Sequence, residues 1–139
     1  MTSTFVTRMK NITTNKFVRR FWFPIVITMT ILTRLPFLWT GYGADDDDWL
    51  VAKSASLLWK TGVYHESRLP GYPLHEILSA PFVGLGGAPL SNTTTLVATL
   101  VSIVVWRKIS NNIGKHKKLL VIAFAFAPVV WQHSAETID

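Results

Sequence analysis

Four consecutive aspartates, at residues 45–48, are the side chains of this 139-residue sequence most able to do chemistry. Neighbouring carboxylates repel one another, so a run of four costs free energy unless a cation or a polar substrate compensates. One aspartate could be a general base for an acceptor hydroxyl, alongside a divalent cation held by oxygen ligands. The simpler alternative is a solvated acidic loop that caps a helix, because runs of like charge are usually solvated.

A second group of polar side chains lies between His65 and Glu76. The planar guanidinium of Arg68 suits a phosphate or pyrophosphate on a lipid, and anchoring in lipid headgroups is the simpler alternative. Tyr72 could bury its ring beside a turn, and Glu76 could cap a helix. His65 and His75 are too loosely spaced to predict a zinc site.

A third acidic group, Glu136 and Asp139, follows an apolar run near the end of the sequence. If both acidic segments face the same side of a membrane, they could share one site, although loop ends are often acidic. The sequence has no cysteine, which excludes disulfides, thiolate metal sites and a cysteine nucleophile.

Three apolar runs separate these groups, at residues 21–33, 88–106 and 119–132. A membrane span needs about 20 mostly apolar residues, which the middle run approaches most cleanly. The first run is followed by Arg34, whose long stem could carry its guanidinium to the interface, and the third reaches span length only by including polar residues. The sequence therefore predicts an all-α integral membrane protein with about three transmembrane helices, at residues 21–40, 88–106 and 119–134.

Charges are divided between alternate segments. The tail at residues 1–20 and the loop at 107–118 are basic and contain no acid, whereas all eight acidic residues lie elsewhere. This asymmetry predicts a cytoplasmic amino terminus, residues 41–87 on the outer face, and a second outer loop starting at 135–139. Because the basic residues flank apolar runs and form no stripe with stacking aromatics, the sequence argues against nucleic acid as a partner and favours membrane lipids. A cleavable signal peptide is the alternative for the first run, and the two later runs count against it.

The outer loop is predicted to contain two amphipathic helices along the membrane surface, at about 46–61 and 73–83. The aspartates stand where a helix amino terminus favours negative charge, and Gly62 is a natural end. The segment 69–73 has turn chemistry, and Pro73 suits the first turn of the second helix.

The order of a basic tail, a span, an acidic loop start, a helix ending in Gly-x-Tyr and then Ser-Arg-Leu-Pro-Gly-Tyr-Pro-Leu-x-Glu resembles one known group of enzymes. It is similar to the amino-terminal part of the GT-C superfamily of multi-spanning glycosyltransferases, such as protein mannosyltransferases and aminoarabinose transferases. The resemblance covers residues 20–139 and is most specific at 45–76. It implies an incomplete GT-C fold that moves a hexose or pentose from a polyprenyl- or dolichyl-phosphate carrier to an undefined acceptor on the outer face. Because family members have many more spans, it also implies that this chain alone is inactive.

The resemblance also assigns residues to roles. The family motif D-x-D-x-W falls on Asp45, Asp47 and Trp49, which implies Asp47 as the acid that activates or orients the acceptor, with Asp45 second. Because the run is filled in, a shift of one residue would move this role to Asp46 or Asp48.

The remaining implied contacts come from the other two polar groups. Arg68 would bind the carrier phosphate, Tyr72 and Glu76 would shape the site, and Glu136 and Asp139 would help bind a substrate or a metal. No other cofactor is implied.

Two other functions stay open on the residues alone. One is a non-enzymatic small membrane protein whose acidic loop binds a partner or cations. The other is a transporter fragment with acids lining a polar path, although no acid falls inside a predicted span.

The predicted orientation is testable with a topology reporter fused after Lys60, which should report the outer face because it follows a basic tail and one span. The same reporter after Asn112, in the basic loop, should report the cytoplasm. A cytoplasmic signal from the first fusion would contradict the predicted outer location of the aspartate run.

Overall fold

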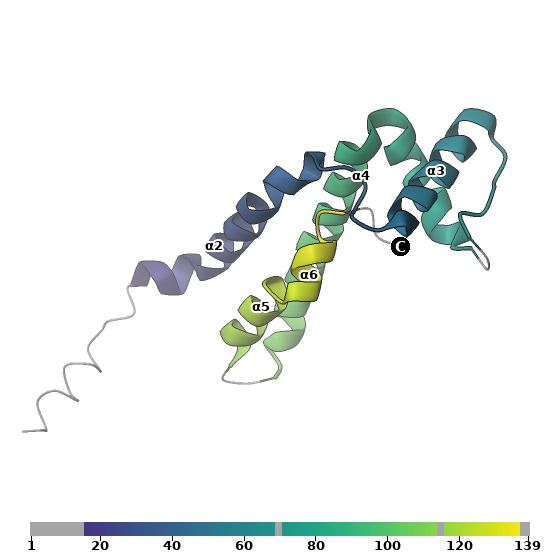
Figure 1. The fold of residues 1–139 in the computed structure, drawn as a ribbon. Helices are drawn as coiled ribbons and strands as arrows, with labels where there is room; N and C mark the ends of the chain where they lie inside the picture. The colour runs from purple at the N-terminus through teal and green to yellow at the C-terminus, as the bar shows by residue number, and fades with distance from the viewer. Residues whose placement is uncertain (1–15, 69–70, 114–115, 137–139) are drawn as a thin grey trace, which may run out of the picture.

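A computed structural model describes residues 16–68, 71–113 and 116–136, with the side chains from Arg20 onward in the first of these ranges. Within these ranges every regular element is helical and there is no strand, which confirms the all-α prediction (Figure 1). The elements are α2 (Lys16–Arg34), the 3-10 helix η1 (Leu35–Trp39), α3 (Asp46–Thr61), α4 (Pro73–Ser110), α5 (Lys117–Ala125) and α6 (Pro128–His133).

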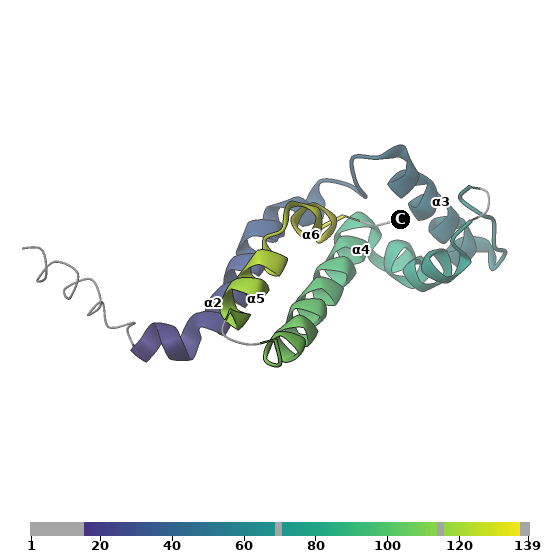
Figure 2. The ribbon, with the colours of Figure 1, turned by 90° about the horizontal axis from the view of Figure 1, so that it is seen from below.

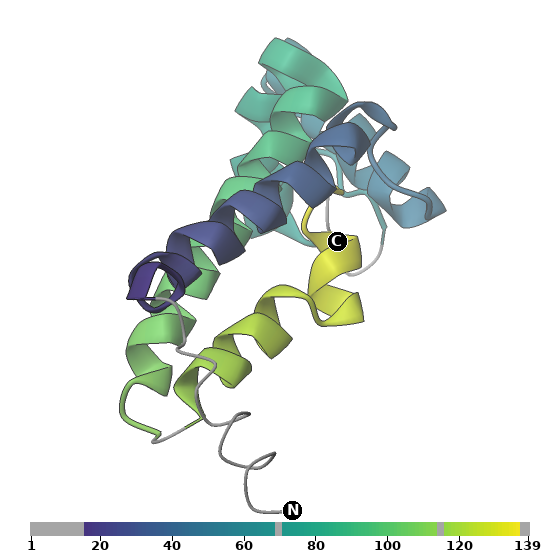
Figure 3. The same ribbon diagram turned by 90° about the vertical axis from the view of Figure 1, so that its left-hand side faces the viewer.

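Helix α4 is central, because it contacts α2, η1, α3 and α5. Its first part packs against α3 at one end of the molecule, and its last part runs beside α5 at the other, as Figure 2 and Figure 3 also show. Small apolar clusters join these elements. Val26, Ile103 and Val121 link α2, α4 and α5, while α3 packs on α4 through small side chains including Ala55 and Ala80.

Two helical segments are long and apolar enough to cross a membrane, Arg20–Trp39 and Pro73–Ser110, with mean hydropathies of 1.6 and 1.5. Only 22% of the apolar window of each is buried inside the molecule, so neither resembles the covered core helix of a soluble protein. The apolar part of the second segment is residues 88–106, where the sequence predicts a span. Large exposed side chains such as Leu32 and Val101 cover both segments, and a lipid environment would bury them.

Helix α3 has the bounds that the sequence predicts, Asp46–Thr61. It ends at Gly62, which is left-handed (φ 71°) and donates its N–H to the Leu58 carbonyl at 2.9 Å. Only a residue without a β-carbon adopts this conformation at little cost.

Helix α4, from Pro73 to Ser110, consists of two helical stretches that meet at a kink, because the backbone at Gly87 leaves the helical region (φ 60°, ψ −149°). The kink lies between the two helices that the sequence predicts, at 73–83 and 88–106. The missing hydrogen bond of Pro89 nearby contributes to this kink.

The predicted single helix over 119–134 is divided into α5 and α6, of nine and six residues. Ala127 between them is extended (φ −56°, ψ 133°), because the ring of Pro128 disfavours helical geometry in the residue before it. Each helix alone is shorter than a span requires, so the described residues hold two candidate spans instead of three.

Trp59 of α3 packs directly against Gly84 of α4, where an added β-carbon would lie 2.1 Å from Cγ of Trp59. The indole ring therefore occupies the space that any other residue would need. This contact explains why a helix interior here contains glycine, which usually weakens helices.

Replacing Gly84 with Ala should lower the free energy of unfolding by about 1–3 kcal/mol, because the added methyl group overpacks the contact with Trp59. The same change in an ordinary helix interior would stabilise by about 1 kcal/mol, so the sign of the effect is diagnostic. Denaturant unfolding of the purified chain in detergent measures it. In a Trp59→Leu background the penalty should disappear, and a penalty that persists there would contradict the proposed contact.

Candidate functional site

The start of α3 and the end of α6 border one acidic cleft of about 430 Å³. Its lining residues are Ala44, Asp45, Asp47, Asp48, Gln132, His133 and Glu136. Two acidic segments that lie far apart in the sequence therefore share one cleft, and they include the predicted site residues Asp45, Asp47 and Glu136. Asp46 is not among the lining residues, and Asp139 lies outside the described part of the chain.

Local interactions set the geometry of the aspartate run. Asp45 is the extended residue before α3, and the next three aspartates form its first turn, where the helix dipole favours negative charge. Asp48 is buried, and a β-carbon on Gly43 would overlap its carboxylate. The indole N–H of Trp49 donates to the Gly43 carbonyl at 3.2 Å, which closes the loop before the helix.

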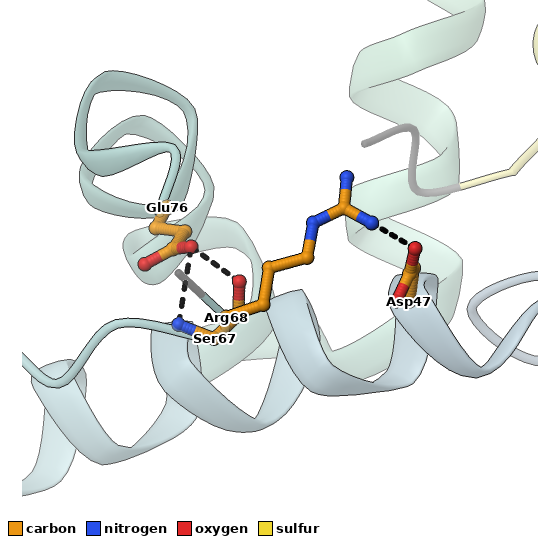
Figure 4. A network of polar contacts seen from close by, with 4 residues as sticks. All are labelled: Asp47, Ser67, Arg68 and Glu76. Carbon is orange, nitrogen blue, oxygen red and sulfur yellow. Dashed lines mark hydrogen bonds and ion pairs between the residues drawn. The ribbon is translucent and has the colours of Figure 1, made fainter. Parts of the chain in front are cut away.

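Asp47 forms an ion pair with Arg68, whose side chain reaches across from the loop after α3 (Figure 4). The guanidinium carbon of Arg68 lies 4.9 Å from the centre of the Tyr72 ring. Three predicted site residues are therefore brought together. The side chains of the ion pair are 32% and 36% exposed, so solvent screening limits its contribution to stability to about 0–1 kcal/mol. A pair this weak can exchange partners readily.

Glu76 is placed differently from the other predicted site residues, because its side chain is completely buried and does not line the cleft. Its carboxylate accepts hydrogen bonds from Ser67 Oγ at 2.5 Å and from Ser54 Oγ at 3.0 Å. The backbone N–H groups of Ser67 and Tyr72 donate to it as well, both at 3.3 Å. The sequence marks Glu76 as polar and helix-opening, but its partners on α3 could not be read from spacing.

Burial alone would raise the pKa of the Glu76 carboxyl, but hydrogen bonds from Ser67, Ser54 and the Tyr72 backbone outweigh burial and hold that pKa below its usual range. The same environment raises the pKa of Tyr64 to about 12, first through burial of its hydroxyl and then through the nearby negative charge of Glu76. Glu76 is therefore ionised and Tyr64 neutral at physiological pH.

Asn92 is a structural residue of the site that sequence reasoning missed. Its side chain is completely buried, and Nδ2 donates to the backbone carbonyls of Leu38 at 3.2 Å and Gly41 at 2.7 Å. These bonds tie α4 to the turn that leads into the aspartate run. The only signal in the sequence is an amide inside an otherwise uncharged run.

Arg34 is completely buried, which corrects the expectation that its guanidinium reaches the membrane interface. It donates to Ser134 Oγ at 2.9 Å and to the Ala125 carbonyl at 2.6 Å. Ala125 is the last residue of α5, and the break before Pro128 leaves carbonyls there without the usual helical donors. Arg34 therefore caps α5 and joins α2 to the segment that carries Glu136, and these two side chains border a small cavity of about 90 Å³.

Among the described residues, no three His, Asp or Glu side chains are arranged to hold a metal ion. The cleft is acidic, but its carboxylates do not converge as the ligands of a bound cation do.

Comparisons with protein-family models, with curated proteins and with solved structures find no match to this chain.

The raised pKa of Tyr64 predicts a late phenol titration, near pH 12 instead of the usual 10. The pKa of Tyr64 is higher in the folded chain than in the unfolded chain. Its contribution to the free energy of unfolding is therefore complete below about pH 10 and is lost as the pH rises through the folded pKa. The tyrosinate absorbance difference between the wild-type chain and Tyr64→Phe isolates this group. Glu76→Gln should lower the Tyr64 pKa without restoring it fully, since burial is the larger cause. Titration of Tyr64 near pH 10 in the wild type would contradict the buried arrangement.

Proposed function

We propose that this chain is the amino-terminal part of a membrane glycosyltransferase, which moves a sugar from a polyprenyl- or dolichyl-phosphate carrier to an acceptor on the outer face. The observation that carries the proposal is the pairing of Asp47 with Arg68 at the edge of a cleft that Asp45 and Glu136 also line. The resemblance to the GT-C superfamily at residues 45–76 and the two apolar helices support it further.

The two members of the ion pair have complementary parts in this reaction. Arg68 binds the carrier phosphate, because a guanidinium offers planar, charge-assisted donors to phosphate oxygens. The acceptor oxygen attacks C1 of the sugar, and the bond from C1 to the phosphate oxygen breaks with its electron pair left on the phosphate. The acceptor proton passes to the carboxylate of Asp47, which acts as the base.

The other candidate side chains have supporting roles around this pair. Asp45 and Glu136 line the cleft where the acceptor would enter, and Tyr72 stacks under the guanidinium of Arg68. The proton transfer to Asp47 does not require a divalent cation.

Carrier binding tests this assignment, because it can be measured on the full chain in lipid nanodiscs without turnover. Arg68→Ala should weaken binding of a short polyprenyl-phosphate sugar about 10-fold to 100-fold, as the loss of charge-assisted hydrogen bonds worth about 1.5–3 kcal/mol implies. Asp47→Asn should bind the carrier as tightly as the wild type or more tightly, because it removes the carboxylate that pairs with Arg68 and would repel the phosphate.

Asp46→Asn is the matched control, since it removes the same charge one residue away and outside the cleft lining. It should leave carrier binding unchanged. In a full-length relative that transfers the sugar, the change equivalent to Asp47→Asn should abolish turnover, while that equivalent to Asp46→Asn should keep it. Equal carrier affinity in the wild type and Arg68→Ala would refute the proposal.

The alternative of a non-enzymatic membrane protein with an acidic binding loop is favoured by the same cleft, which three aspartates and Glu136 line. A cationic partner would bind less tightly to Asp47→Asn, which is the opposite of the result expected for an anionic carrier. The same variants therefore separate the two functions.

A further inference from the structure

Glu76 is a buried carboxylate that the proposed reaction does not use directly. Its side chain is completely covered, whereas Asp47 and Arg68 are each about one-third exposed. Burying a charge is costly unless hydrogen bonds satisfy it, and an apolar side chain would avoid this cost. The arrangement of the bonds to Glu76 indicates what it does.

Three donors from the loop converge on one oxygen of Glu76. Oε1 accepts from the backbone N–H and the hydroxyl of Ser67, and from the backbone N–H of Tyr72. Ser67 directly precedes Arg68, and Tyr72 provides the ring that lies under the guanidinium. The same carboxylate oxygen therefore fixes the chain on both sides of Arg68, and Figure 4 shows its two bonds to Ser67.

The second oxygen of Glu76 ties this loop to the helix that carries Asp47. Oε2 accepts from Ser54 Oγ of α3 at 3.0 Å, and the N–H of Glu76 itself donates to the Tyr72 carbonyl at 2.9 Å. A simple helix cap would need only the bond to Tyr72, because Ser54 and Ser67 belong to neither end of α4.

We propose that Glu76 is the positioning residue for Arg68, since its carboxylate joins the loop to α3 and α4 and so holds the guanidinium against Asp47. The phosphate that Arg68 receives rests on the proposed function, whereas the positioning itself concerns only residues of this chain. An arginine side chain loses about 2 kcal/mol of rotamer entropy when it is fixed. If the backbone is held and the guanidinium is stacked before the ligand arrives, ligand binding has to offset less of this entropy loss.

The carboxylate offers charged acceptor sites on both oxygens, whereas a glutamine keeps one acceptor oxygen and places a neutral NH₂ donor where the other stood. Glu76→Gln therefore preserves size and removes the negative charge that strengthens the hydrogen bonds from Ser67 and Tyr72.

The position of Arg68 can be followed directly by the NMR signal of its Nε–Hε group in the full chain in detergent micelles, with assignment from Arg68→Lys. Glu76→Gln should shift and broaden this signal relative to the wild type, because the weakened bonds to Ser67 and Tyr72 hold the backbone around Arg68 less firmly. Glu66→Gln is the matched control, because it makes the same charge change on the same loop at an exposed side chain, and it should leave the signal in place.

Ser67→Ala provides a milder second variant, which removes one donor and keeps the carboxylate. It should move the Arg68 signal in the same direction as Glu76→Gln. An unchanged Arg68 signal in folded Ser67→Ala and Glu76→Gln chains would overturn the proposal, and so would an equal change in Glu66→Gln.

Binding of a short polyprenyl phosphate gives a second readout that a merely structural role would not move. Glu76→Gln should weaken it about 10-fold to 100-fold, as misplacement of a binding group by about 1 Å typically does. Glu76→Asp, which restores the charge, should recover part of the loss, and Glu66→Gln should match the wild type. If the wild-type chain binds no polyprenyl phosphate, the proposed function fails, while the Arg68 signal still decides the positioning role.

Discussion

Two buried polar side chains on α4 hold the acidic part of this molecule in place. Glu76 binds the loop after α3, and Asn92 binds the turn before it, so both ends of the segment that contains the aspartates are attached to one helix. The apolar clusters are small and cannot fix these positions alone. Because a buried carboxylate or amide must keep its partners, these bonds define the geometry more strictly than packing would.

Local sequence signals predicted the elements whose causes are local. The bounds of α3 follow from Gly62 and from acids in the first turn, and both signals lie within the helix or next to it. The break before Pro128 was also readable, but the prediction gave more weight to the apolar run than to the proline. The burial of Arg34 could not be read, since its partners lie 91 and 100 residues further along the chain.

In the candidate site as well, features with local causes were predictable from the sequence, and those that depend on distant residues were not. That Asp47 and Glu136 share a cleft was predictable from alternation of segments across a membrane, without knowledge of any distance. The pairing of Asp47 with Arg68 required the loop to fold back over α3, which spacing alone does not specify. Glu76 was recognised as polar, but its burial depends on Ser54 and Ser67, two serines that carry no signal in a single sequence.

The kink at Gly87 separates the part of α4 that packs under the site from the apolar part beyond it. When residues 88–106 lie in a bilayer, the kink angle sets how far the cleft stands above the hydrocarbon. The position of the cleft then depends on membrane thickness. A bilayer of different thickness would change the tilt of the apolar part of α4, and with it the depth of the acidic side chains relative to the headgroups. For the proposed function, the access of the lipid-linked carrier to the guanidinium would then depend on the lipid composition around the chain.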